Sequence, residues 1–146
     1  MDAIDSILRR LDMIERRLDE ANRLGPPRVY RASVTTTDAT TTTIYTFSTV
    51  TNTVYEFDII LIGIRTDVSG NTNAYRFLFK AENIGGTIVR SGMTDSGGDT
   101  AIWQAEDDAS WNVQSAQSGT NVLIQVIGAA GQTINWSMRA TVEQQA

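Results

Sequence analysis

The sequence predicts a mainly β protein in which an N-terminal, parallel, three-stranded coiled-coil helix precedes an antiparallel β-sandwich of jelly-roll-like type. Two observations support this prediction. Residues 4–24 repeat every seven positions, and the repeat stops at Gly25-Pro26-Pro27. From Tyr30 onward the helical period disappears, and short alternating segments follow, separated by glycine-rich turns. We therefore divide the 146 residues into a coiled-coil helix (1–25), a linker or edge strand (26–42) and a β-sandwich domain (43–146).

Composition narrows the possible functions. The formal net charge is −5, Lys80 is the only lysine, and the sequence has no cysteine and no histidine. Disulfides, a thiol nucleophile, the commonest general base and the usual zinc ligand are therefore excluded. An acidic chain lacks the basic surface that nucleic-acid binding needs, and the sequence shows neither a signal peptide nor a membrane-spanning run. We expect a soluble protein made in a cytoplasm, with no cofactor, metal, nucleic acid or membrane insertion.

The N-terminal repeat has the pattern of a coiled coil. With Ile4 at heptad position a, Asp recurs at each b position and Arg at each f position, four residues later, where the two can pair. A helix packed on its own domain would not require polar positions that repeat by seven, so we favour the coiled coil. Asp2 is the expected N-cap. The expected interface residues, at positions a and d, are Ile4, Ile7, Leu11, Ile14, Leu18 and Ala21.

The side chains at these positions favour three or four helices. Isoleucine at both a and d, then leucine at a, disfavours a dimer, and no polar residue specifies one. In a parallel bundle Arg10 at position g faces Glu15 at position e of the next helix, and the stretch from Arg10 to Glu15 resembles a short trimerisation motif. Leu8 at position e widens the apolar stripe, which leaves room for a larger assembly or a docking partner. Three heptads are marginal alone, so we expect the β domain to contribute to association.

The strands are recognised by alternation. In Ile134–Glu143 the apolar residues from Ile134 to Val142 point one way and polar residues point the other, as in an antiparallel sheet with one wet face. Residues 129–132 form the expected turn before it, and residues 67–72 form another. The other expected strands are 43–48, 53–66, 73–80, 87–91, 101–104, 110–116 and 121–128.

Strand 53–66 is apolar on both faces. One face carries Tyr55, Phe57, Ile59 and Leu61. The opposite face carries Ile60, Ile62 and Ile64. In a small sandwich only one face meets the core, so a second cover is needed, either the chain's own loops or a neighbouring subunit. The coiled coil favours a subunit interface at these three isoleucines. Gly63 is expected to mark a bulge or bend in this strand.

Acidic residues are the only catalytic candidates. Asp95 and Asp99 bracket a Ser-Gly-Gly loop, and Glu106-Asp107-Asp108 precede a Ser-Trp pair. A glycosidase needs two carboxylates held across a sugar-binding cleft, and the spacing here does not indicate one, so solvated loop acids are the simpler interpretation. Residues 67–73 alternate oxygen side chains as in a calcium loop. Leu78 stands where the closing glutamate belongs, so a hairpin turn is favoured.

The three tryptophans divide into two groups. Trp136 lies on the apolar face of its strand, and Trp111 is also assigned to the core. Trp103 and Tyr45 are the better candidates for surface aromatic residues that could stack on sugars. Trp103, Asp95 and Asp99 are accordingly the residues expected to contact a glycan if the protein binds one.

Parts of the β half resemble a β-sandwich domain of bacteriophage virion proteins. The stretches are "DDASWNV", "VLIQVIGAAGQTINWSMRATVE" and "TVYEFDIILIGIRTD", and the likeness covers about residues 43–143. In that family a Ser-Trp strand is followed by a Val-rich strand, a Gly-x-x-Gly turn and Thr-Ile-x-Trp. The resemblance implies a fold and a virion setting, commonly as a trimer, and assigns no binding residues. The matching positions are Trp111, Gly128, Gly131, Thr133, Ile134 and Trp136.

Together these observations predict a non-enzymatic, homotrimeric structural protein on the surface of a phage particle. It would be a capsid decoration or head fibre, or a small tail-fibre or baseplate knob, in contact with other capsid or tail proteins. The alternative is a receptor-binding head that recognises host-surface glycans, and a glycan hydrolase is a third, weaker possibility.

Overall fold

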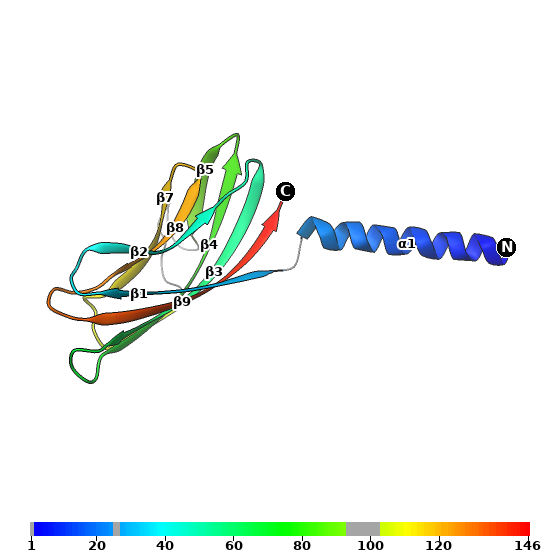
Figure 1. Ribbon diagram of the computed structural model, residues 1–146. Coiled ribbons are helices and arrows are strands. Elements are labelled where there is room, and N and C mark those ends of the chain that lie inside the picture. The colour runs from blue at the N-terminus through cyan, green and yellow to red at the C-terminus, as the bar shows by residue number, and fades with distance from the viewer. Residues whose placement is uncertain (1, 25–26, 93–102) are drawn as a thin grey trace.

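The computed structural model describes residues 2–24, 27–92 and 103–146. Within these ranges one helix, α1, projects from the end of a two-layer β-sandwich at which the C-terminus lies (Figure 1). The mainly β, antiparallel part of the predicted fold class is confirmed, whereas the jelly-roll and coiled-coil-trimer assignments stay predictions. The elements are α1 (Ala3–Leu24), β1 (Arg28–Thr36), β2 (Thr41–Ser48), β3 (Thr53–Arg65), β4 (Thr72–Ile84), β5 (Thr87–Gly92), β6 (Trp103–Glu106), β7 (Asn112–Ser118), β8 (Asn121–Ile127) and β9 (Ile134–Gln145).

The strands form two sheets. The larger, sheet A, has the order β1-β9-β3-β4-β5, and β6 also pairs with β4; the smaller, sheet B, has the order β2-β8-β7. All the pairings are antiparallel. The first strand pairs with the last and the second with the last but one, whereas β3–β4 and β7–β8 are local hairpins. The chain therefore closes its sandwich with contacts between its two halves.

The core lies between the inner faces of the two sheets. Phe47 of sheet B packs against Tyr55 and Phe57 of sheet A, with ring centroids 5.1 Å apart in both contacts. Trp111 and Trp136 pack edge to face at 5.8 Å, and both are 1% exposed. Burial follows the expected alternation, because on β3 the residues from Tyr55 to Leu61 at every second position are buried.

The sandwich begins earlier than the sequence-based boundary at residue 43. Residues 28–36 form β1, an edge strand of sheet A paired along its length with β9, so of the two alternatives for segment 26–42, linker or edge strand, the edge strand holds for these residues. Its inward side chains are Tyr30, Ala32, Val34 and Thr36. They alternate with polar residues and are mostly small or hydroxylated, which made this strand hard to recognise.

Gly63 does not mark a bulge, contrary to the expectation. Its pairing with both neighbouring strands is regular, and the register shift in the described strands lies between Thr43 and Tyr45 of β2. A Cβ atom at Gly63 would lie 2.9 Å from Cζ3 of Trp136. Glycine is therefore needed here for the close approach of a tryptophan ring.

The positions that carry the resemblance have structural roles. A Cβ atom at Gly128 would lie 2.6 Å from Oγ1 of Thr36, and Gly131 has a φ of 72° in the turn before β9. Ile134 is fully buried, as are the two tryptophans. These residues form the core and one turn of the sandwich, which fits the resemblance as one of fold.

Candidate assembly interfaces

Helix α1 begins at a side-chain cap. Oδ1 of Asp2 accepts a hydrogen bond from the backbone N of Asp5 at 2.9 Å, which satisfies one of the free N–H groups at the start of the helix. The predicted cap is confirmed. The helix then runs to Leu24, one residue before the Gly-Pro-Pro stop, as the inability of proline to continue a helix requires.

The apolar seam of α1 is uncovered in the single chain. We define this seam as the described a and d residues, which are all at least half exposed: Ile4, Ile7, Leu11, Ile14 and Leu18. Leu11, at its middle, is 50% exposed. The side chain of Ala21, the last predicted seam residue, lies outside the described residues. The seam does not fold back on its own sandwich, and Leu8 extends it as an exposed neighbour.

The charged flanks of the seam are also exposed. Arg10 and Glu15 lie at the surface, and neither belongs to an ion pair among the described residues of the chain. Both side chains are therefore accessible to a neighbouring helix, as the predicted interchain pair requires. That pair stays a prediction.

A second uncovered apolar surface lies on sheet A. Ile62 and Ile64 are 44% and 49% exposed, and Ile60 is half-buried, on the face of β3 opposite the core. The described loops do not cover this outer face. Ile62 is flanked by Ala74 and Ser137 on the neighbouring strands, so the surface beside it is flat. The chain's own loops were one of the two expected covers for this face. In the described residues they do not cover it.

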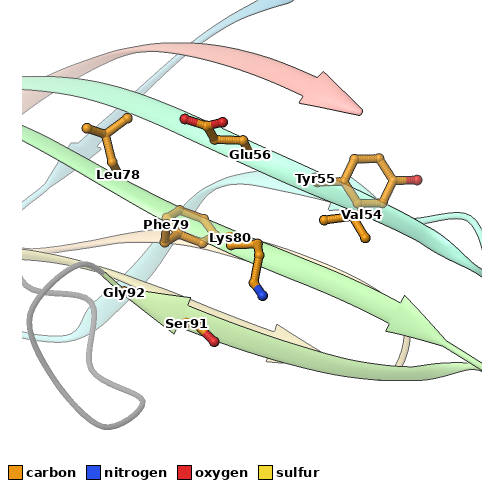
Figure 2. Close-up of a pocket in the computed structure, with 8 residues that line it drawn as sticks. All are labelled: Val54, Tyr55, Glu56, Leu78, Phe79, Lys80, Ser91 and Gly92. Atoms are coloured by element: carbon orange, nitrogen blue, oxygen red, sulfur yellow. The ribbon is translucent and has the colours of Figure 1, made fainter. Parts of the chain in front are cut away.

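A shallow hollow of about 410 Å³ lies on the same side of sheet A, toward the end near the helix. Figure 2 shows the side chains around it, with Glu56 on β3, Leu78 and Lys80 on β4, and Ser91 on β5. Lys80 forms an ion pair with Glu82 on its own strand. The hollow is open, and its charged groups are the ammonium of Lys80 and the carboxylate of Glu56. We treat it as part of the outer face of sheet A.

Charged residues accompany the isoleucines. Nε and Nη2 of Arg76 contact the two oxygens of Asp58 at 3.1 and 2.9 Å, a bidentate pair beside Ile60. Arg31 lies opposite Arg139 on the neighbouring strand. The sequence showed that Arg139 faces solvent, but the register that brings it to Arg31 could not be read from it.

Two of the three acidic candidates before β7, Asp107 and Asp108, hold a loop in place. Asp108 accepts hydrogen bonds from Ser110, and its Oδ2 accepts one from Nε2 of Gln132 at 3.0 Å. These bonds lower the pKa of Asp108 to about 2. Oδ2 of Asp107 accepts a bond from the backbone N of Thr72 at 3.0 Å. These two carboxylates are therefore engaged as structural acceptors, and Asp95 and Asp99 lie outside the described residues.

A buried polar network anchors the same loop. Nδ2 of Asn73 donates to the hydroxyl of Tyr75 at 2.8 Å and to the backbone O of Asp108 at 2.7 Å. The Tyr75 hydroxyl donates to the backbone O of Trp111 at 3.1 Å. Burial raises the pKa of the Tyr75 phenol, so the group remains a donor at neutral pH. Nothing in this arrangement resembles a pair of free carboxylates across a cleft.

The calcium-like stretch is a hairpin loop. Oδ1 of Asp67 accepts from Nε of Arg65 at 2.8 Å and from the backbone N of Thr133 at 3.2 Å. The Arg65 guanidinium is the main cause that lowers the pKa of Asp67 to about 2. In the described residues no group of three or more acidic side chains is placed to hold a metal ion.

The tryptophans lie as predicted. Trp111 and Trp136 are in the core, whereas Trp103 is 54% exposed on β6, opposite Arg76 of β4. Tyr45 is half-buried and packs on Tyr30 at 5.4 Å, so it is a weaker surface candidate than Trp103. The part of the chain that the structure describes has no helix that is long and apolar enough to span a membrane.

No protein-family model matches the sequence, and no curated protein matches it. Two solved structures show a distant likeness in fold. One is the tailspike protein of Acinetobacter phage vB_ApiP_P1, with 15% identity and a TM-score of 0.40 over 82% of this chain and 22% of that chain. The other is the tailspike protein of Acinetobacter baumannii phage AM24, with 11% identity and a TM-score of 0.37 over 78% of this chain and 26% of that chain. This chain therefore spans about a quarter of the length of either protein.

Proposed function

We propose that the chain is a non-enzymatic, homotrimeric structural protein on the surface of a bacteriophage virion. It would serve as a capsid decoration or head fibre, or as a small tail-fibre or baseplate knob. The observation that carries the proposal is the uncovered seam of α1, beside a sandwich that already has a complete core. Large apolar side chains held on a projecting helix gain stability only when another helix covers them.

The side chains in the seam favour three or four helices, and the stretch from Arg10 to Glu15, which resembles a trimerisation motif, favours three. Isoleucine occupies both a and d in the first heptad, and leucine at a is followed by isoleucine at d in the second. The exposed Arg10 and Glu15 fit a parallel arrangement of neighbouring helices. The exposed Leu8 at the N-terminal end would help the trimer to dock on another capsid or tail protein.

The virion setting rests on the sequence resemblance. Its positions fall in order along the β half, and in the structure they are core and turn residues. The non-enzymatic assignment rests on the absence of histidine and cysteine from the sequence and on the structural use of Asp107 and Asp108. Unchanged polysaccharide after long incubation with the purified protein is the expected result.

The proposal is tested by locating the protein on intact particles. Phage particles labelled with an antibody against the sandwich, and imaged at low resolution, should show label at fixed points on the head or tail. Label only in the lysate, with none on purified particles, would contradict a structural role on the virion. The position of the label also decides between a capsid decoration and a tail component.

A second candidate is a receptor-binding head that recognises host-surface glycans. The exposure of Trp103 in the single chain favours it, because an exposed indole can stack on a sugar ring. Glycan-array binding by the purified trimer that is lost in Trp103→Ala would support this function. A well-folded trimer that binds no glycan would remove it.

A further inference from the structure

We propose that the outer face of sheet A is the surface through which three copies of the sandwich pack together. Ile60, Ile62 and Ile64 of each copy would meet at the three-fold axis. This inference rests on the proposed trimer and adds to it a specific β interface and its occupant, two further copies of this chain.

The connection between helix and sandwich keeps the three sandwiches close. Three residues separate Leu24 from Arg28, which limits the distance between the end of α1 and the start of β1 to roughly 13 Å. Helices packed about 8–10 Å apart in a three-stranded bundle lie roughly 5 Å from their common axis. Each sandwich therefore starts within about 20 Å of that axis. Since each is two sheets thick, with sheets about 10 Å apart, the three copies lie close enough together to touch.

The outer faces of the two sheets differ in the side chains that they expose to solvent. On sheet B, Nε2 of Gln114 donates to Gln125 at 2.7 Å, and Nε2 of Gln125 donates to Thr43 at 3.2 Å. Polar side chains there satisfy one another within the chain. On sheet A the central strand instead exposes Ile62 and Ile64. Sheet A is therefore the face that gains more from being covered.

The charges on the outer face of sheet A balance. By strand register and alternation this face carries four basic and four acidic side chains, although the whole chain has a net charge of −5. Two copies can therefore approach through this face without the net repulsion that the rest of the surface would give. The basic residues are Arg31, Arg76, Lys80 and Arg139, and the acidic residues are Glu56, Asp58, Glu82 and Glu143.

Four of these charges, those of Arg31, Arg139, Glu56 and Glu143, belong to no ion pair among the described residues. Arg31 lies directly opposite Arg139, and Glu56 lies between Glu143 on β9 and Lys80 on β4, which is itself paired with Glu82. Like charges opposite one another on neighbouring strands destabilise a sheet, and a surface that brings both signs of charge relieves them. Another copy of the same face is such a surface.

The dimensions of sheet A fit a closed three-fold arrangement. Five strands in a row, with β3 in the middle, span roughly 19 Å at about 4.8 Å per strand. Three such faces closed into a triangle place each central strand roughly 6 Å from the axis, a gap that isoleucine side chains fill. The β9 side of one copy then meets the β4 side of the next. Glu143 and Lys80 are level across the sheet, so Glu143 approaches Lys80 of the neighbouring copy.

Cysteine cross-linking in the full-length chain tests this arrangement, because the natural sequence has no cysteine. Ile62→Cys, treated with a short bifunctional maleimide, should give covalent dimers on a denaturing gel. The control, Thr43→Cys on the outer face of sheet B, should give at least tenfold less. If both variants have a trimeric mass and Ile62→Cys does not cross-link, or Thr43→Cys cross-links equally, the inference is overturned and the trimer stands. A monomeric mass would remove both proposals.

A charge substitution gives a second, independent measurement. Ile62→Asp should raise the concentration at which the trimer dissociates by about tenfold or more, because the buried isoleucine is replaced by a carboxylate at the axis. Val68→Asp is the matched control, since Val68 is 50% exposed in the β3–β4 loop. Its dissociation should be unchanged. Equal effects of the two substitutions would contradict the inference.

Discussion

The helix and the sandwich place their apolar residues in opposite ways. In the sandwich the first strand pairs with the last, and the large aromatic residues between the sheets are almost completely buried. In α1 the apolar residues form a regular seam that is at least half exposed along its described length. A sandwich whose core is complete within one chain can fold alone. A helix with a regular but uncovered seam indicates a need for further copies, so the sandwich can fold without the helix, whereas assembly depends on it.

A charged residue introduced into the seam of α1 is the strongest test of this difference between helix and sandwich. Leu11→Asp should convert the trimer to monomers while the sandwich keeps its β circular-dichroism spectrum, because a carboxylate at position a would be buried without a partner. Met13→Asp is the matched control, since Met13 is 57% exposed at position c, outside the seam. It should remain a trimer by light scattering. Loss of assembly in both variants, or in neither, would contradict this difference.

A substitution in the core should act on the sandwich alone. Trp136→Ala should lower the free energy of unfolding by about 3–5 kcal/mol, because it empties the space beside Trp111. Trp103→Ala, at an exposed tryptophan, should change it by about 0.5 kcal/mol or less. Urea unfolding followed by near-ultraviolet circular dichroism measures both. Similar losses from the two substitutions would mean that the core has been assigned wrongly.

Gly63→Ala should destabilise the sandwich by about 1–3 kcal/mol, because the new methyl group meets the Trp136 ring at 2.9 Å. Gly63→Ala should cost less free energy of unfolding in a Trp136→Phe background, because that substitution removes the nearest ring atoms. A double-mutant cycle from urea unfolding measures this coupling. Additive effects would show that the glycine is needed for another reason.

Acid should weaken the loops at the end of the sandwich away from the helix. The pKa values of Asp67 and Asp108 are lowered to about 2, from an ordinary value of about 3.9 in an unfolded chain. Their stabilisation is therefore fully present above about pH 4 and is lost as the pH falls toward 2. The melting temperature should fall over this range, and it should fall less in Asp108→Asn. An unchanged acid dependence in that variant would exclude this carboxylate as the cause.

The smallest effect on trimer stability is expected for substitutions of Arg10 and Glu15, which flank the seam. Arg10→Glu should weaken the trimer by about 0.2–1 kcal/mol, since exposed ion pairs contribute little. Adding Glu15→Arg should restore the loss if the two residues pair between neighbouring helices. Sedimentation at low salt measures both variants, and failure of the double variant to recover would argue against the pairing.

The elements that could be predicted from the sequence are those whose period is strong. The seven-residue repeat located α1 and its end, and the apolar alternation of Ile134–Val142 located β9. The segment 26–42, which contains β1, could only be assigned as a linker or an edge strand, because Ala32 and Thr36 give a weak pattern. Strand β4 extends beyond Lys80 because Ala81 and Asn83 are buried there, which a polar side chain does not suggest.

Contacts between distant segments could not be read from local pattern. The network of Asn73, Tyr75 and Asp108 joins residues about 35 positions apart, so their roles depend on how the strands meet. The register that places Arg31 opposite Arg139 has the same origin. For the candidate interfaces, the sequence identified Ile60, Ile62 and Ile64 as needing a second cover, and the structure shows that the described part of the chain does not supply one.

Sedimentation equilibrium of the full-length chain at micromolar concentration tests the central claim most directly. The account predicts one species with three times the 16.0 kDa mass of the chain, independent of loading concentration across that range. A single species with the mass of one chain would contradict it, because the exposed seam of α1 would then remain in water.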